Sequence, residues 1–301
     1  MMHSLRELGE DRLLAQILPQ LKRNSQVVAG AGDDCAVVKF RGAKEWLLLK
    51  SDCVVEGVHF VTRSSARAVG WKAMMRALSD FAAMSGVPRF ALVTLVVAGK
   101  KQLMWVRHLY RGLRQAARYF DVAIVGGESS DTDGPTVIVV SVAGFVEDDR
   151  CIRRSGGKAN DDLFVTGKLG GSIRGRHLNF VARIEEARWL TANFKVHAMM
   201  DLSDGLGADL PRLAGASRLA FSIDERALPV SRGCTVQQAI SDGEDYELLF
   251  AISRRDRARL ERRWRKKFPK LGLTRIGYLH KKSKIKHQIS LRGYVHFRQR
   301  R

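Results

Sequence analysis

The chain has 301 residues, of which 45% are hydrophobic and 28% are charged. This balance is typical of a globular protein with a substantial core, and it excludes a disordered or fibrous chain. No apolar run approaches the roughly 20 residues that cross a bilayer, and the first residues lack the unbroken apolar stretch of a signal peptide. We therefore expect a soluble, cytoplasmic protein without a membrane partner.

The net charge of +21 is concentrated at the C-terminal end of the chain. Residues 254–301 contain 19 Lys or Arg residues and two acids, so this segment alone carries +17. Such a segment is able to attract nucleic acid. However, Leu260, Trp264 and Phe268 recur at helical spacing, which favours an amphipathic helix with a basic, solvated outer face followed by a basic tail. Because no groove-reading motif is present, we do not expect a nucleic-acid partner.

Strand-like and helix-like segments alternate along the first half. Residues 46–55, 90–97 and 136–146 are rich in β-branched or aromatic residues and are bounded by turns, which predicts strands. Amphipathic helices are predicted over about 66–84 and 101–120. The second helix keeps a set of apolar residues on one side: Leu103, Val106, Leu113, Ala117 and Phe120.

A polar, glycine-bearing stretch at about 147–162 marks a predicted domain boundary. A strand at 163–167 and a helix near 180–193 follow it. The sequence therefore predicts an α/β (α+β) protein with two mixed domains, residues 1–147 and 148–301.

The four cysteines, Cys35, Cys53, Cys151 and Cys234, lie far apart and form no C-x-x-C pair. No histidine lies near them at zinc-ligand spacing. We therefore expect reduced, structural cysteines rather than a disulfide framework or a zinc site.

Acidic residues recur where an apolar segment meets a glycine or serine turn. Asp34 lies in GAGDDCAVV, Asp52 follows WLLLKS, Glu128 follows the strand VAIVGG, and Asp201 and Asp204 lie in MMDLSDGLG. Carboxylates beside apolar segments are costly to bury unless they are paired or bind a metal. Several of them at one site provide the hard oxygen ligands that Mg²⁺ shares with phosphates, and glycines let backbone N–H groups approach those phosphates.

Each of these motifs taken alone is also typical of a simple turn, and Asp201 or Ser203 is placed to cap a helix beginning in DGLGADLPRL. Asp80 is harder to explain in this way, because it lies in a helical pattern of Ala, Leu, Phe and Met. The set as a whole favours a magnesium–phosphate site. The chain contains no P-loop, no protein-kinase signature and no nucleophile elbow.

The motifs occur in an order that resembles the thiamine-monophosphate kinase family, within the aminoimidazole ribonucleotide synthetase-like superfamily of ATP-using enzymes. The resemblance extends over about residues 30–297, through GDDCAVV, SDCVVEGVHF, KAMMRALSDFAAMSGVP, VGGESS, RRSGGKANDD, MMDLSDGLGADL, SDGEDYELLF and RGYVHF. It implies ATP-dependent phosphorylation of thiamine monophosphate to thiamine diphosphate. It also implies a homodimer that pairs through the N-terminal sheets, with Mg²⁺ and nucleotide between the domains.

The resemblance further implies site residues by position. The implied magnesium ligands are Asp34, Ser51, Asp52, Asp80, Glu128, Asp201 and Asp204. The implied ATP contacts are Gly127, Glu128, Arg154 and Ser203. The implied contacts of the thiamine phosphate are His59, Glu244 and Tyr294. Because the acceptor is already an oxyanion, positioning and charge neutralisation suffice, and we expect no residue that acts as a general base.

The chain departs from the family pattern at several positions. Glu128 stands where the family has Asp, Ala77 where it has Asn, and Lys50 where it has a small residue. The late Gly-Gly pair is Asp242-Gly243, and an R-P-x-P-R stretch is represented only by HLNFVAR at 177–183. Lys50 brings a positive charge close to the proposed metals unless it points away along its strand.

We expect an active enzyme, with reduced or altered activity as an open alternative. Two further alternatives remain at this point. One is another ATP-using enzyme of the same superfamily, and the other is a catalytically impaired protein that binds nucleic acid through its basic C-terminus.

Overall fold

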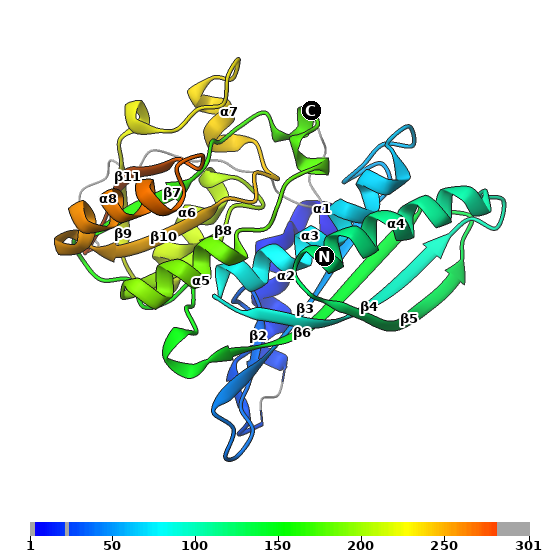
Figure 1. Ribbon diagram of the computed structural model, residues 1–301, viewed down its shortest axis with the longest axis horizontal. Helices are drawn as coiled ribbons and strands as arrows, with labels where there is room; N and C mark the ends of the chain where they lie inside the picture. Colours follow the sequence, from blue (N-terminus) through cyan, green and yellow to red (C-terminus); the bar gives the residue numbers. More distant parts are fainter. Residues whose placement is uncertain (1–3, 22–23, 282–301) are drawn as a thin grey trace.

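The computed structural model describes residues 4–21 and 24–281 (Figure 1). Tyr294 and the basic tail beyond residue 281 lie outside the described residues. The chain forms two sheets with helices packed on them, and the predicted boundary after residue 147 falls between the last strand of the first sheet and the first strand of the second. The division into two domains at that residue stays a prediction.

The first sheet has six strands in the order β1-β2-β3-β6-β4-β5. Their bounds are β1 (Val27–Ala29), β2 (Ala36–Val38), β3 (Glu45–Val55), β4 (Val87–Val97), β5 (Ala123–Asp131) and β6 (Val137–Glu147). Neighbours are antiparallel except for β4 and β5, which run parallel. Burial alternates residue by residue along β6, as expected of a central strand covered on one face.

Two helices cover one face of this sheet, α3 (Ala66–Ala83) and α4 (Leu103–Tyr119). Both predicted helices are therefore present. On α4, Leu113 and Ala117 are buried, but Leu103 is 62% exposed. The expected apolar side thus begins one turn later than predicted, because the first turn of α4 extends beyond the part that packs on α3.

The second sheet has five antiparallel strands in the order β8-β10-β7-β11-β9. Their bounds are β7 (Asp161–Thr166), β8 (Val196–Asp201), β9 (Ala220–Ile223), β10 (Leu248–Ser253) and β11 (Leu273–His280). Its helices are α5 (Ile184–Asn193), α6 (Leu206–Ala216), α7 (Val236–Ser241) and α8 (Arg257–Lys267). The remaining elements are α1 (Leu5–Leu8), α2 (Glu10–Ile17) and the short 3-10 turns η1 (Leu18–Gln20), η2 (Asp148–Arg150), η3 (Ser172–Arg174), η4 (Arg176–Leu178), η5 (Glu225–Ala227) and η6 (Arg254–Asp256).

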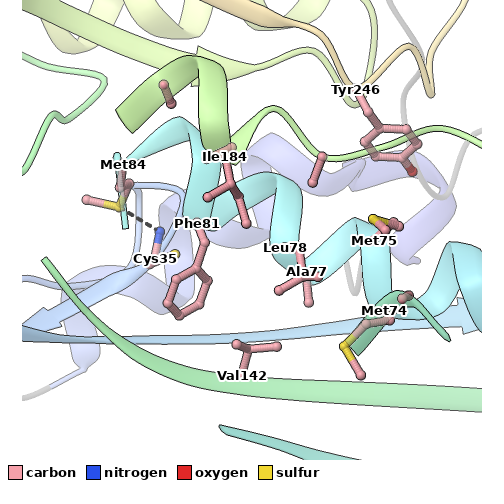
Figure 2. Close-up of a cluster of buried hydrophobic side chains, with 14 of the residues drawn as sticks. Cys35, Met74, Met75, Ala77, Leu78, Phe81, Met84, Val142, Ile184 and Tyr246 are labelled. Atoms are coloured by element: carbon pink, nitrogen blue, oxygen red, sulfur yellow. Dashed lines mark hydrogen bonds between the residues drawn. The ribbon is translucent and has the colours of Figure 1, made fainter. Parts of the chain in front are cut away.

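Helix α3 lies between the two sheets and packs on both halves of the chain. It contacts β3 and β6 of the first sheet, and α5 and β8 of the second half (Figure 1). Met74, Leu78 and Phe81 are fully buried on it (Figure 2). Burying one such side chain contributes about 1.5–3 kcal/mol. The backbone N–H of Cys35 donates to the sulfur of Met84 at 3.0 Å, which ties the loop before β2 to the end of α3.

Helix α8 lies in the described part of the basic segment, and it is amphipathic as predicted. Leu260 and Trp264 are buried, and the indole Nε1 of Trp264 donates to the carbonyl oxygen of Leu271 at 3.0 Å. Phe268 follows the end of the helix and contacts the Trp264 ring. Among the described residues, no helix is long and apolar enough to cross a bilayer.

The helices α3 and α4 approach each other at two facing glycines. A Cβ atom on Gly70 would lie 2.0 Å from the carbonyl oxygen of Leu109, and one on Gly112 would lie 1.9 Å from that of Arg67. Gly112→Ala therefore forces the helices apart, and we expect it to lower the free energy of unfolding by about 3 kcal/mol. Gly215→Ala is the matched control, because among the described residues no atom lies within 4 Å of a Cβ at this helical position.

We expect Gly215→Ala to raise the free energy of unfolding by about 0.5–1 kcal/mol, the gain of alanine over glycine in a helix. Urea unfolding of both variants and the wild type measures the difference. Equal stabilities of the two variants would contradict the close helix crossing.

Candidate functional site

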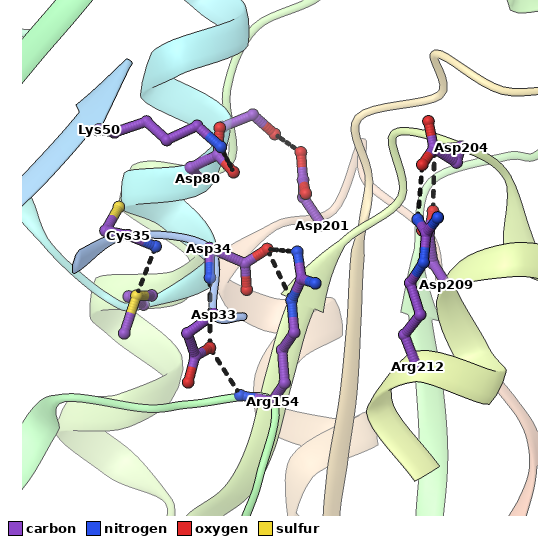
Figure 3. Close-up of polar contacts among 12 residues, drawn as sticks. Asp33, Asp34, Cys35, Lys50, Asp80, Arg154, Asp201, Asp204, Asp209 and Arg212 are labelled. Carbon is purple, nitrogen blue, oxygen red and sulfur yellow. Dashed lines mark hydrogen bonds and ion pairs between the residues drawn. The ribbon is translucent and has the colours of Figure 1, made fainter. Parts of the chain in front are cut away.

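Three buried carboxylates from distant parts of the chain meet beside α3 (Figure 3). Asp34 precedes β2, Asp80 lies in the last turn of α3, and Asp201 ends β8. One oxygen of each lies within 4.8 Å of the others. We call these three residues the carboxylate cluster.

Hydrogen bonds hold two members of the carboxylate cluster in place. Arg154 donates from Nη2 and Nε to Asp34 Oδ1 at 2.7 Å and 3.2 Å, and its backbone N–H donates to Asp33 Oδ1 at 3.0 Å. The Ser79 hydroxyl donates to Asp201 Oδ2 at 2.5 Å. The ion pair between Arg154 and Asp34 fixes the loop before β2 against the segment that joins the two sheets.

The carboxylate cluster has more acid than its neighbours compensate. Burial raises the pKa of Asp80 well above its usual range, and Asp52 adds to this while Lys50 opposes it. Burial, followed by the nearby charge of Asp34, raises the pKa of Asp201 to about 6. Both shifts report charged oxygens brought close together in a poorly hydrated space.

A divalent cation fits the carboxylate cluster. Asp34 Oδ2 is buried and has no hydrogen-bond partner within the described part of the chain. Hard carboxylate oxygens are the ligands that Mg²⁺ takes, usually together with water and phosphate oxygens. An orphaned acceptor beside two further carboxylates is therefore suited to hold a metal ion rather than a neutral ligand.

Strand β3 brings one predicted ligand to the carboxylate cluster and turns another away. Lys50 and Asp52 face α3, and the Lys50 ammonium lies 2.8 Å from Asp80 Oδ1 and 3.6 Å from Asp52 Oδ1. Lys50 therefore points into the site and not away along the strand. Ser51 lies on the opposite face, where its hydroxyl contacts that of Ser141 at 2.9 Å, because successive side chains of a strand alternate.

Asp204, another predicted metal ligand, is engaged elsewhere in the described structure. It pairs with Arg212 at 2.5 Å, and Arg212 also contacts Asp209 at 3.0 Å (Figure 3). Helix α6 begins after Gly205, and no side chain in the described structure caps it. The capping role considered for Asp201 or Ser203 is therefore wrong.

A cavity of about 270 Å³ lies next to Asp204, which forms part of its lining. Its lining brings together the predicted contacts His59, Ser203, Asp204 and Glu244 with Arg76. The backbone N–H of Glu244 donates to the carbonyl oxygen of Ser203 at 2.7 Å, which joins the two loops that form one wall.

A buried lysine balances one acid of this cavity. Lys72 is fully buried, and its Nζ donates to Glu244 Oε1 at 2.6 Å and to the His59 carbonyl oxygen at 2.6 Å. Burial lowers the pKa of Lys72 to about 8, while the Glu244 charge opposes this effect. The His59 ring accepts at Nδ1 from the backbone N–H of Val55 at 3.0 Å, so this nitrogen is the unprotonated one.

Within one chain, the structure does not bring Gly127 and Glu128 to the carboxylate cluster. Both lie inside β5 and not after it, and β5 is three strands from β3. A Cβ on Gly127 would lie 1.8 Å from the carbonyl oxygen of Val93. Strand packing therefore requires glycine at this position. Glu128 is exposed and accepts from the N–H of Ser129 at 2.9 Å.

Two cationic residues of the site, Lys72 and Arg76, were not predicted from the sequence. With Asp80 they are spaced by four residues along α3, so all three lie on one face of the helix. Arg76 Nε is buried without a partner among the described residues, and Arg76 lines the cavity. A charged residue at every fourth position of an otherwise apolar helix was the available signal.

Comparisons with known proteins place the chain among enzymes of related sequence. Residues 32–146 match the family model "AIR synthase related protein, N-terminal domain", and residues 130–263 match the corresponding C-terminal domain. A thiamine-monophosphate kinase of Rhodopirellula baltica is 36% identical over 269 residues, covering 84% of each chain. One of Bacillus subtilis is 31% identical, covering 97% of this chain and 100% of the relative.

The fold is also similar to solved structures. A structure described as AaThiL complexed with AMPPCP and TMP has a TM-score of 0.85 at 30% identity, covering 98% of this chain and 99% of that one. The structure of hydrogenase maturation protein HypE with ATP has a TM-score of 0.65 at 17% identity, a likeness that shows the fold alone.

The orphaned oxygen of Asp34 leads to a prediction about metal binding. We expect Mg²⁺ or Mn²⁺ to raise the melting temperature of the wild type by several degrees, because the ion relieves repulsion in the carboxylate cluster. Asp34→Asn removes one charged ligand, so the shift on adding metal should largely disappear. Asp133→Asn, at an exposed acid, is the control and should retain the full shift. A shift of equal size in all three proteins, measured by calorimetry, would argue against this site.

Proposed function

Because the chain belongs to the thiamine-monophosphate kinase family, we propose that it transfers the terminal phosphoryl group of ATP to thiamine monophosphate, giving thiamine diphosphate. The observation that carries the proposal is the carboxylate cluster beside a cavity with cationic and polar walls, in a chain 36% identical to a thiamine-monophosphate kinase. The use of ATP and the four unpaired cysteines support a cytoplasmic location.

We propose that Asp34, Asp80 and Asp201 hold Mg²⁺. When bound, this ion supplies positive charge that neutralises the phosphate oxygens of both substrates. Arg154 has a planar fork of donors and lies at the same place, so it is suited to orient a phosphate of ATP. Ser203 lies two residues after Asp201, where the carboxylate cluster meets the adjoining cavity, and is proposed as a further contact of ATP.

The cavity is proposed as the acceptor site. Arg76 lines it from α3 with an Nε that has no hydrogen-bond partner in the described chain, which makes it a donor for the phosphate of the acceptor. His59 and Glu244 line the same space, with Val58 and Ile173 as apolar walls. Tyr294, outside the described residues, remains a proposed ring contact to the thiamine moiety.

No general base is needed for this transfer. The attacking atom is a phosphate oxygen that is already ionised near neutral pH, so the residues of the site act by orientation and charge compensation. Lys72 neutralises Glu244 from within the core, which leaves the other cations of the site available for phosphate.

We also propose a homodimer that pairs through the open face of the first sheet. Apolar side chains are exposed there: Leu49 (41%), Phe90 (47%), Leu92 (48%) and Val125 (60%). They share a shallow hollow with Ser51 and Ser141. Exposed apolar surface of this kind is typical of a protein–protein interface.

The same dimer accounts for Glu128. Within one chain β5 is three strand spacings from β3, about 14 Å, so a glutamate there does not reach the carboxylate cluster. We propose that Glu128 and the backbone at Gly127 act in the site of the second copy. The longer side chain of Glu128 relative to Asp then alters a contact between subunits.

The activity is tested with purified protein, Mg-ATP and thiamine monophosphate, by coupled ADP release and chromatography of thiamine diphosphate. We expect thiamine diphosphate with this acceptor and none with unphosphorylated thiamine. Asp80→Asn should lower kcat/KM by about 100-fold or more, the scale on which loss of one charge-stabilising group acts. Asp133→Asn should match the wild type.

Absence of thiamine diphosphate in this assay, in a protein that melts cooperatively and binds Mg-ATP, would overturn the proposed substrate. Turnover of another phosphorylated or carboxylated acceptor would then favour a different ATP-using enzyme of the same superfamily.

The oligomeric state is tested by size exclusion with light scattering. We expect the wild type to have the mass of a dimer, because exposed apolar side chains line one hollow on the open face. The double variant Leu92→Glu/Val125→Glu should elute as a monomer, since two buried, unpaired charges oppose association. Leu103→Glu, at an apolar residue exposed to 62% on α4, is the matched control and should remain dimeric. A monomeric wild type would contradict the proposed interface.

A further inference from the structure

Lys50 places a fixed positive charge inside a group of acids that is otherwise suited to metal ions. Its ammonium lies 2.8 Å from Asp80 Oδ1 and 3.6 Å from Asp52 Oδ1, so it bridges a carboxylate of α3 and one of β3. The Lys50 side chain is 21% exposed, and that of Asp80 is 9% exposed. This contact is therefore well shielded from solvent.

The strand geometry fixes the direction of the lysine. Lys50 and Asp52 are two residues apart on β3, so their side chains lie on the same face of the sheet, toward α3. In the sheet register, Lys50 is opposite Val142 of β6 and Asp52 is opposite Val140. On its other edge β3 pairs with β2 only over Leu47–Leu49, so β6 alone flanks the strand at Lys50 and Asp52.

The space among Asp34, Asp80 and Asp201 differs from the space between Asp80 and Asp52 in whether a metal ion can bind there. On one side, Asp34 Oδ2 is buried without a partner in the described residues, and Asp34, Asp80 and Asp201 have oxygens within 4.8 Å of one another. On the other side, the space between Asp80 and Asp52 is occupied by the ammonium. A divalent ion bridging those two acids would lie next to a like charge that the chain cannot move far away.

We propose that Lys50 is a built-in cation that takes the place of a divalent ion between Asp52 and Asp80. The protein then binds divalent ions on the Asp34–Asp80–Asp201 side and has one such site fewer than its acids would otherwise provide. This inference rests on the proposed function in one respect, namely that the carboxylate cluster is the metal site of the phosphoryl transfer.

The inference is tested by counting bound Mn²⁺ per chain by electron paramagnetic resonance, with and without a nonhydrolysable ATP analogue. We expect Lys50→Ser to bind one Mn²⁺ more than the wild type, because the position between Asp52 and Asp80 becomes free. Lys50→Arg keeps the charge and should keep the wild-type count. Lys39→Ser, at an exposed lysine on the neighbouring β-hairpin region, is the control and should also keep it.

Thermal melting gives a second measurement that a purely structural lysine would not reproduce. In a chelating buffer, Lys50→Ser should melt below the wild type, because Asp80 and Asp52 lose their cation. Adding Mg²⁺ should restore most of this loss, since the ion occupies the vacated position. The melting curve also shows that the variant is folded before its ions are counted.

Equal Mn²⁺ counts in the wild type and Lys50→Ser would overturn the inference, as would a melting loss that Mg²⁺ does not reverse. These results leave the kinase proposal intact if the wild type binds Mn²⁺ and forms thiamine diphosphate. Failure of both proteins to bind Mn²⁺ would overturn the inference and the proposed metal role together.

Discussion

Repulsion among buried carboxylates is the constraint on which the rest of this structure depends. Asp34, Asp80 and Asp201 have oxygens within 4.8 Å of one another, although they come from a loop, a helix and a strand end. Arg154 and Lys50 compensate part of this charge. The hydrophobic packing of α3 opposes the repulsion that is left, because its buried residues keep Asp80 in a place where hydration is poor.

Strong local patterns made much of the fold and part of the site predictable from the sequence. The strands β3, β4 and β6 have apolar runs with β-branched or aromatic residues between turns, and Asp80 was recognisable as an acid in an apolar helix. The direction of Ser51 was not predictable, because the phase of the pleat decides which face a strand residue occupies. The distance of Glu128 from the carboxylate cluster follows from the strand order, which no local pattern encodes.

The cavity shows how the chain holds a polar loop in an unusual conformation. Glu244 and Tyr246 have φ values of 63° and 52°, a left-handed region that residues with side chains rarely adopt. Their backbone N–H groups donate to the carbonyl oxygens of Ser203 and Leu202, and the Tyr246 ring stacks on Phe180 with centroids 4.0 Å apart. Strain of this kind persists only where surrounding contacts outweigh it, and here it fixes the direction of the Glu244 carboxylate.

Helix α3 belongs to both halves of the molecule, because its buried residues join one continuous core that includes Val142 of β6 and Phe164 and Phe250 of the second sheet. Neither half can be separated without exposing that shared surface to water. We therefore expect the two sheets to unfold together, in spite of their separate strand ladders. Rigid opening and closing of one half against the other is also disfavoured, so access for a substrate depends on the loops around the cavity rather than on a hinge between the sheets.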